Sequence, residues 1–541
     1  MMDEAQGERP ESADSHHKLD RKEAIFLAVI IALGLLLTFV QANSLILNSD
    51  HSQSALIFYD LQEERPHLLA GWYLPTNNYL LTDTTFYVIT GSLFGMGPTT
   101  VRLTAWVIFL LGVLAAATIV NRAFSLKPAL YSAAGMLFLP AIATGELLKP
   151  QNHNGNILFS LIAYLVASHC LDESEIARKD AIVLLPLLAL VTTAGVFSDP
   201  TMLFTFSLPF VLTLITLSAL KRELPASGAK TLTLIGLVIL VSGGAILLQY
   251  AVSMNTELQL SRFLMQTNSI ALEELSASLA FTSKILAILF GLMEKDGGFS
   301  IVNIARALLL VAAIASALLA FKNEKDARRQ YFLVFLFVMG SLIAASFVFR
   351  AKPFELNTAR YLIPVLYCQA VFVGIALSGY YRTHPSTLHR TLRGYRYVVL
   401  GAFALCIVLV GAGVATTAPA RQKNLELAEF LEENGLDFGY SQFWYANIIT
   451  LNSENRVKVR PIEFTKHGAR PFFWSSNENW YSPDPDLGPS FLLVPEGTND
   501  YGFSIVSPMM MQAMFGPPVR QLEYEGTRIY VWDKNILGIR R

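Results

Sequence analysis

Long apolar runs alternate with short polar segments over the first four fifths of the chain. A helix needs roughly 17 to 25 apolar residues to cross about 30 Å of hydrocarbon. Eleven runs approach that length: residues 24–43, 101–121, 128–145, 154–171, 181–197, 201–219, 231–251, 299–321, 331–348, 359–380 and 397–418. The pattern predicts an α-helical polytopic membrane protein with about 11 transmembrane helices.

The character of the sequence changes at about residue 419. Beyond it, strand-like runs at 490–494 and 527–532 stand beside the helix-like run 425–433, which predicts a small soluble α/β domain. We therefore divide the chain into three parts: an N-terminal tail of residues 1–23, a transmembrane domain of residues 24–418, and a soluble domain of residues 419–541.

Composition agrees with a membrane protein. Of the 541 residues, 53% are hydrophobic and only 15% are charged, so most of the chain needs a bilayer as solvent. The net charge of −1 implies no nucleic-acid partner. The 3 cysteines all fall inside apolar runs, where they are expected to pack as small hydrophobes rather than form disulfides.

Basic residues predict the orientation, because Lys and Arg in short loops stay in the cytoplasm. A cytoplasmic N-terminus puts 19 basic residues on that side. The opposite loops then hold 7: Arg65, Lys149, Arg262, Lys284, Lys295, Arg350 and Lys352. An odd number of spans leaves the C-terminal domain on the extracytoplasmic side.

Two apolar segments have an alternative interpretation. The run from Ala24 to Val40 could be a cleaved signal peptide, although it is longer than the usual apolar region of one. The stretch from Leu279 to Met293 would reverse every later loop if it crossed the membrane. We therefore interpret it as a helix that lies on, or dips into, the outer face.

The first external loop, residues 44–99, is too long for a simple connector, and long ordered loops usually serve function. Asp50-His51 follows the first span, and residues 54–61 predict an amphipathic interfacial helix that ends near Asp60. Asp83 lies further along the loop. Each of these carboxylates could instead be an ordinary solvated charge.

The second external turn, residues 146–155, is unusually polar for a turn between two spans. It contains His153, which could serve chemistry or simply satisfy a turn. Asp199, in the third turn, is expected to be a helix N-cap.

Together these features resemble the GT-C superfamily of polyprenyl-phosphate-sugar glycosyltransferases, especially protein O-mannosyltransferases and the lipid A aminoarabinose transferase. The resemblance covers roughly residues 24–380. Its marks are Asp50 after the first span, the helix at 54–61, the turn Gly71-Trp72, and the late motif Arg360-Tyr361-Leu362-Ile363-Pro364. This chain departs from the family in having Asp50-His51 where an Asp-Glu pair is common, and in lacking an acidic residue in the stretch 151–154.

The resemblance implies a division of labour among the site residues. Asp50 would take the proton of the attacking acceptor hydroxyl, with Asp60 and His153 as the next candidates. Arg350, Lys352, Arg360 and Tyr361 would hold the donor phosphate and stabilise its growing charge. Because of the departures, a divalent cation is possible but doubtful, and no cofactor is certain.

A second group of residues would contact the sugar or the acceptor. It comprises Trp72, Glu146, Asn154, Trp474 and Trp480. The aromatic members suit stacking on sugar rings, but packing between the two domains is an equal alternative.

The resemblance implies partners and a location as well. The donor would be a polyprenyl-phosphate-linked sugar, and the acceptor would be a glycan, lipid or protein. The protein would lie in a bacterial inner membrane, with its site on the periplasmic side. Two other functions compete: a lipid or glycan transporter or flippase, for which Arg306 could line a pathway, and a glycan polymerase or ligase.

Overall fold

A computed structural model describes most of the chain. The described residues are 19–63, 69–171, 178–220, 222, 224, 226–261, 270–350, 354–378, 400–408, 422–465, 468–481, 488–495 and 507–537.

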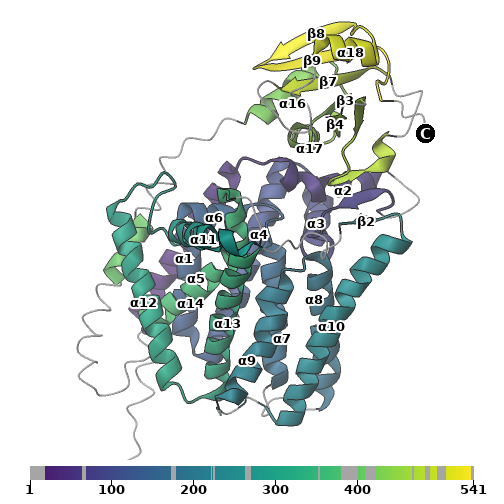
Figure 1. Cartoon of the computed structure of the whole chain (residues 1–541). Coiled ribbons are helices and arrows are strands. Elements are labelled where there is room, and N and C mark those ends of the chain that lie inside the picture. The colour runs from purple at the N-terminus through teal and green to yellow at the C-terminus, as the bar shows by residue number, and fades with distance from the viewer. Residues whose placement is uncertain are drawn as a thin grey trace, which may run out of the picture.

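Long helices run side by side below a smaller, sheet-containing domain (Figure 1). These helices are α1 (Arg21–Ser44), α4 (Pro98–Ala123), α5 (Leu126–Leu137), α7 (Asn154–Leu171), α8 (Arg178–Ser198), α9 (Leu208–Ala219), α10 (Gly228–Asn255), α12 (Ile301–Asn323), α13 (Ala327–Phe349) and α14 (Ile363–Ser378). Many large apolar side chains of α1, α10 and α12 stay exposed, as helices that face lipid require.

Seven helices in the described part of the chain are long and apolar enough to cross a membrane, or eight if one bent pair counts as a span. The predicted runs 181–197 and 201–219 are present as shorter helices, the second preceded by the π-helix η4 (Leu203–Ser207). The run 397–418 is helical over 400–408, and its other residues lie outside the described ones. The total of eleven spans is therefore not established.

The predicted span 128–145 is wrong as one straight helix. It consists of α5 and α6 (Ala141–Leu148), which meet at an angle of 91°. Pro140 stands at the break, where its missing N–H and its ring prevent α5 from continuing. The break turns α6 away from α5 and brings the chain to the polar turn that follows.

The doubtful apolar stretch near residue 280 forms α11 (Leu275–Leu289), which follows the short η6 (Leu272–Glu274). In Figure 1, α11 lies across the ends of the long helices rather than alongside them. This arrangement agrees with a helix on one face of the helical bundle.

The first loop is folded rather than extended. It contains η2 (Ser49–Ser52), α2 (Gln53–Gln62), β1 (Trp72–Leu74), the π-helix η3 (Leu80–Thr84) and α3 (Thr85–Phe94). The predicted helix at 54–61 is confirmed as α2, but its amphipathic character is wrong. Every residue from Gln53 to Asp60 is buried, because the C-terminal domain covers the side that the pattern left for solvent.

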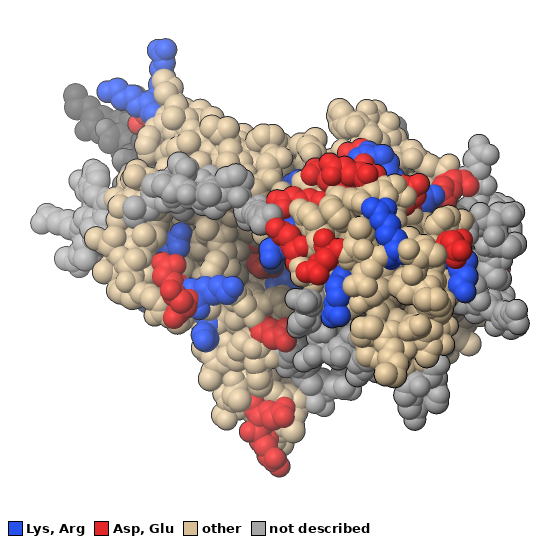
Figure 2. Space-filling view, turned by 90° about the horizontal axis from the view of Figure 1, so that it is seen from above, with Lys and Arg blue, Asp and Glu red and all other residues tan. Residues whose placement is uncertain are grey.

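The C-terminal domain is the expected α/β unit. Its six strands run in the order β5-β4-β3-β7-β9-β8, and β3 is parallel to both of its neighbours. The strands are β3 (Phe438–Ser441), β4 (Lys458–Thr465), β5 (Gly468–Pro471), β7 (Ser490–Pro495), β8 (Arg520–Tyr524) and β9 (Thr527–Trp532), and the helices are α16 (Lys423–Glu433), α17 (Phe443–Asn452) and α18 (Pro508–Phe515). Acidic and basic side chains interleave on its outer face (Figure 2), as is usual for a solvated domain.

Backbone pairing joins the two domains. β1 of the first loop pairs with β2 (Gln259–Leu260), which follows α10, and with β6 (Ser476–Asn477) of the C-terminal domain. Arg102 of α4 adds a side-chain link, because its Nη2 donates to Gln422 Oε1 at 2.9 Å. The C-terminal domain is thereby held over the polar loops of the helical domain.

Candidate functional site

Three polar segments meet beneath the C-terminal domain: the start of the first loop at η2, the turn between α6 and α7, and η7 (Leu356–Leu362) before α14. One amide ties the first two together. In the amide orientation that gives both the side-chain nitrogen and oxygen a partner, Gln151 donates to the Asp50 backbone carbonyl at 3.1 Å and accepts from the Ser54 hydroxyl at 2.6 Å. Residues about a hundred positions apart thus form one site.

Asp50 is partly buried at the start of η2. Burial raises the pKa of its carboxyl above the usual value, because the charged form loses hydration, and the nearby positive charge of Arg360 opposes this effect. A carboxylate with a raised pKa is a better proton acceptor. The sequence-based choice of Asp50 thus falls on a carboxylate within electrostatic reach of Arg360, one of the expected phosphate-binding residues.

His51, beside it, has a structural role. Its ring Nδ1 accepts from the Asn48 backbone N–H at 3.1 Å, and the backbone N–H of His51 donates to Asn48 Oδ1. Burial, together with the positive charges of Lys149 and Arg360, lowers the pKa of His51 to about 3. This ring is neutral and capped, so it does not stand in for the second carboxylate of the family pattern.

Two of the expected phosphate-binding residues, Arg350 and Arg360, contact the ring of a third, Tyr361. The guanidinium carbons of Arg350 and Arg360 each lie 5.3 Å from the centre of its ring, and Arg360 Nη2 also approaches its hydroxyl at 3.5 Å. Arg360 Nε is buried and has no hydrogen-bond partner among the described residues. Two guanidinium groups on one ring make a site of concentrated positive charge. Lys352 lies outside the described residues.

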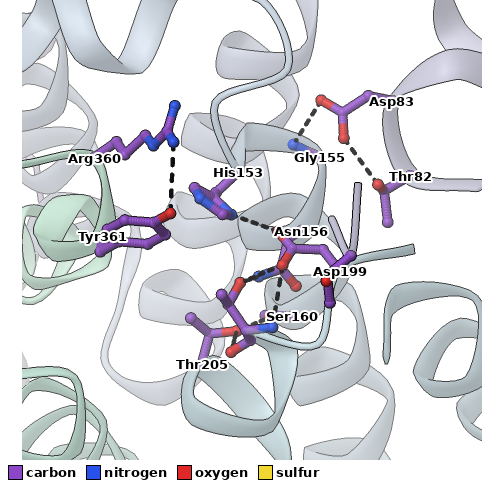
Figure 3. Close-up of polar contacts among 12 residues, drawn as sticks. Thr82, Asp83, His153, Gly155, Asn156, Ser160, Asp199, Thr205, Arg360 and Tyr361 are labelled. Atoms are coloured by element: carbon purple, nitrogen blue, oxygen red, sulfur yellow. Dashed lines mark hydrogen bonds and ion pairs between the residues drawn. The ribbon is translucent and has the colours of Figure 1, made fainter. Parts of the chain in front are cut away.

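His153 also contacts Tyr361, with the two ring centres 5.2 Å apart (Figure 3). Its Nδ1 lies 2.6 Å from Asp199 Oδ2, and both side chains are buried. Asp199 was expected to be a helix N-cap. Its Oδ1 accepts from the Thr201 backbone N–H at 3.1 Å within the turn, whereas the N-cap of η4 is Met202. The same carboxylate therefore caps a turn and orients a histidine.

Asp83 is a functional candidate that sequence reasoning underrated. It is fully buried in the π-helix η3, and its carboxylate accepts from the Thr82 hydroxyl at 2.8 Å and the Gly155 N–H at 3.3 Å. Burial, with a contribution from the negative charge of Asp199, raises its pKa to about 7. The only sequence signal was a carboxylate between two threonines, which is also typical of an ordinary turn.

Gly155 is required for this contact, because a Cβ there would lie 2.2 Å from Asp83 Oδ2 and 2.9 Å from the Thr82 carbonyl carbon. We expect Gly155→Ala to destabilise the protein by about 1–3 kcal/mol, as overpacking of a rigid contact does. The measurement is thermal unfolding of the purified chain in detergent.

The matched control is Gly243→Ala in α10, where a Cβ meets no described atom within 4 Å. Combining Gly155→Ala with Asp83→Ser should restore part of the stability, since the clashing carboxylate is removed. Equal unfolding temperatures for Gly155→Ala and the wild type would contradict the tight contact.

Glu146 and Asn154 shape the second turn. Glu146 pairs with Lys149 at 2.5 Å and accepts from Asn152 Nδ2 at 3.1 Å. Asn154 Nδ2 donates to the Leu147 carbonyl, while its Oδ1 is buried without a partner among the described residues. Glu146 is thus engaged within the turn, whereas Asn154 retains a free acceptor.

Asp60 and the tryptophans lie at the domain junction. Asp60 accepts from Trp480 Nε1 at 3.0 Å and from Asn477 Nδ2 at 2.9 Å. The Trp480 ring packs edge-on against Trp72, and both tryptophans are buried. This geometry favours the packing interpretation over sugar stacking and ties Asp60 to domain docking. Trp474 remains partly exposed.

No group of three or more His, Cys, Asp or Glu side chains within the described ranges is arranged to hold a metal ion.

Neither a family model nor a curated protein matches this sequence. Solved structures do resemble the fold. ArnT from Cupriavidus metallidurans in the apo state matches with a TM-score of 0.58 and 12% identity, over 94% of this chain and 98% of ArnT. ArnT bound to undecaprenyl phosphate matches with a TM-score of 0.53 and 11% identity, over 96% and 100%.

An archaeal enzyme has a related fold. The Archaeoglobus fulgidus oligosaccharyltransferase in complex with Zn and sulfate matches with a TM-score of 0.51 and 12% identity, over 93% of this chain and 72% of that one. The chain spans 64% of the same enzyme tethered with an acceptor peptide. This chain therefore shares the fold of ArnT, which is the GT-C fold expected from the sequence.

Proposed function

We propose that this protein is a membrane glycosyltransferase that moves a sugar from a polyprenyl-phosphate donor to an acceptor hydroxyl. The observation that carries the proposal is the site itself. A partly buried carboxylate, Asp50, lies within electrostatic reach of Arg360, which shares the Tyr361 ring with Arg350. A proton acceptor near a cluster of positive charge is what such a transfer needs. The GT-C fold, shared with an ArnT structure that binds undecaprenyl phosphate, supports the donor class.

The reaction would be a single displacement. The acceptor oxygen attacks the anomeric carbon while Asp50 takes its proton, and the bond from that carbon to the phosphate oxygen breaks. The phosphate oxygen keeps the electron pair, and Arg350 and Arg360 stabilise the charge that develops there. Attack opposite to the leaving group inverts the configuration of the sugar. Lys352 remains a candidate third cation.

The orientation follows from the basic residues. With the N-terminus in the cytoplasm, the C-terminal domain and the site lie on the extracytoplasmic side of a bacterial inner membrane. The acceptor would then be a cell-envelope glycan, lipid or protein. Two residues are available to contact the acceptor. The Trp474 ring is partly exposed, and the Asn154 side-chain oxygen has no hydrogen-bond partner among the described residues.

The decisive experiment follows lipid-phosphate release. The purified full chain in nanodiscs is supplied with a set of undecaprenyl-phosphate sugars and an envelope extract as acceptor. Sugar transfer with stoichiometric release of undecaprenyl phosphate is the expected result. Movement of intact donor across the bilayer without release would identify a flippase instead and overturn the proposal.

A further inference from the structure

His153 is held more firmly than a turn residue requires. It immediately precedes α7 in a left-handed backbone conformation, with φ of 67°. Its ring is buried with 3% of the residue exposed, and its Nδ1 meets a carboxylate that is itself fixed by the Thr201 N–H and hydroxyl. A carboxylate on Nδ1 sets the ring orientation and leaves Nε2 as the open position.

That open position has nothing to bind within the protein as described. Nε2 of His153 is buried and finds no hydrogen-bond partner among the described residues. Buried polar atoms are nearly always paired, so an orphan beside a functional site indicates a missing ligand. Figure 3 shows the ring between the Asp199 side and the Arg360-Tyr361 side of the site.

The neighbours of the ring indicate which ligand. Tyr361 is 5.2 Å from it and Tyr79 is 5.9 Å from it, centre to centre. Tyr361 is the same ring on which the two guanidiniums lie. Asp199 thus lies on one side of His153, and Tyr361 with its two arginines lies on another. A phosphate held by the arginines is the ligand that this arrangement favours.

His153 has one competing role. Its ring contacts the same Tyr361 ring as the two arginines, so it could either donate to a phosphate held there or act as a base. The second test below separates these two roles.

We propose that His153 Nε2–H is a third hydrogen-bond donor to the lipid phosphate, held in place by Asp199 as a positioning residue. This inference rests on the proposed function. The doubly protonated ring is balanced by the Asp199 carboxylate and donates to the phosphate oxygen as the sugar bond breaks. His153 keeps its proton throughout, and the acceptor proton goes to Asp50. His153, paired with Asp199, would thus stand in the stretch 151–154, which lacks the usual acidic residue.

The first test separates the two ring nitrogens. In His153→Asn, the side-chain amide can still donate to Asp199 but cannot reach the Nε2 position, and Asn tolerates the left-handed backbone. His153→Gln places its amide nitrogen near the Nε2 position instead. The probes are undecaprenyl phosphate and undecaprenol, which lacks the phosphate, bound to the full chain in nanodiscs of neutral lipid.

We expect His153→Asn to bind undecaprenyl phosphate roughly ten- to a hundredfold more weakly, the loss of one hydrogen bond to a charged group. Undecaprenol binding should be unchanged, and His153→Gln should recover part of the loss. Wild-type affinity of His153→Asn for undecaprenyl phosphate would overturn the inference. An equal loss for both probes would also overturn it, by making His153 a purely structural residue.

The second test uses Asp199→Asn and discriminates donor from base. The introduced amide donates to Nδ1, so the proton of the neutral ring must sit on Nε2. A donor role survives this change, with undecaprenyl phosphate still bound and transfer still measurable. A base role does not, because the Nε2 lone pair is blocked. Intact binding with transfer reduced by roughly 10⁴-fold would therefore overturn the inference.

The two proposals fail separately. If the wild type binds undecaprenyl phosphate with the predicted dependence on His153 but never transfers sugar, the phosphate contact stands and the glycosyltransferase function falls. If the wild type transfers sugar and His153→Asn matches it in binding and rate, only the inference on His153 falls.

Discussion

Asp50→Asn should reduce sugar transfer by roughly 10²-fold or more, the usual contribution of a general base. The amide is nearly the same size as the carboxylate but cannot accept the hydroxyl proton. Undecaprenyl phosphate should still bind, because the proposed function assigns the donor phosphate to Arg350 and Arg360. Initial rates of lipid-phosphate release, measured beside donor binding and thermal unfolding, separate lost chemistry from lost structure.

The pH profile adds a second criterion for Asp50. Burial raises its pKa, so the carboxyl becomes protonated, and useless as a base, at a higher pH than an exposed aspartate. Transfer should therefore fall as the pH is lowered through this pKa, and Asp50→Asn should lose that limb. Asp296→Asn, on an exposed aspartate between α11 and α12, is the matched control. Wild-type rates in Asp50→Asn would show that Asp50 takes no part in the reaction.

The apolar pattern predicted the helices well where a helix is straight and faces lipid. Transfer of apolar side chains from water determines the positions of such helices, as in α1 and α4. It failed between α5 and α6, because hydrophobicity does not report the direction of the backbone at Pro140. It also failed for α2, whose burial depends on a domain that lies hundreds of residues away in the sequence.

The residues of the candidate site could be gathered from the sequence only in part, for a similar reason. Asp50 and the pair Arg360-Tyr361 could be chosen because each belongs to a recognisable local pattern, and the fold brings them within electrostatic reach. The pairing of His153 with Asp199 joins residues 46 positions apart, each of which looks like an ordinary turn residue by itself. Only the packing of α7 against α8 brings them together.

Arg360→Lys should lose most of the transfer activity although it preserves the charge. A guanidinium offers a planar fork that can contact two phosphate oxygens at once, while an ammonium is a single point of charge. Arg360 is also held on the Tyr361 ring, with its Nε buried and without a described partner, so its fork is oriented before the donor arrives. Loss of one charged hydrogen bond corresponds to roughly a ten- to hundredfold lower rate.

The effect should appear mainly in kcat, because negative charge on the phosphate grows as the sugar leaves and the fork is needed most at that point. Arg470→Lys is the matched control: it makes the same substitution in the C-terminal domain, on a side chain that is 65% exposed and paired with Glu463. That variant should transfer sugar at the wild-type rate. Equal activity in the Arg360 and Arg470 variants would mean that Arg360 only attracts anionic lipid headgroups. A lysine serves that purpose as well as an arginine.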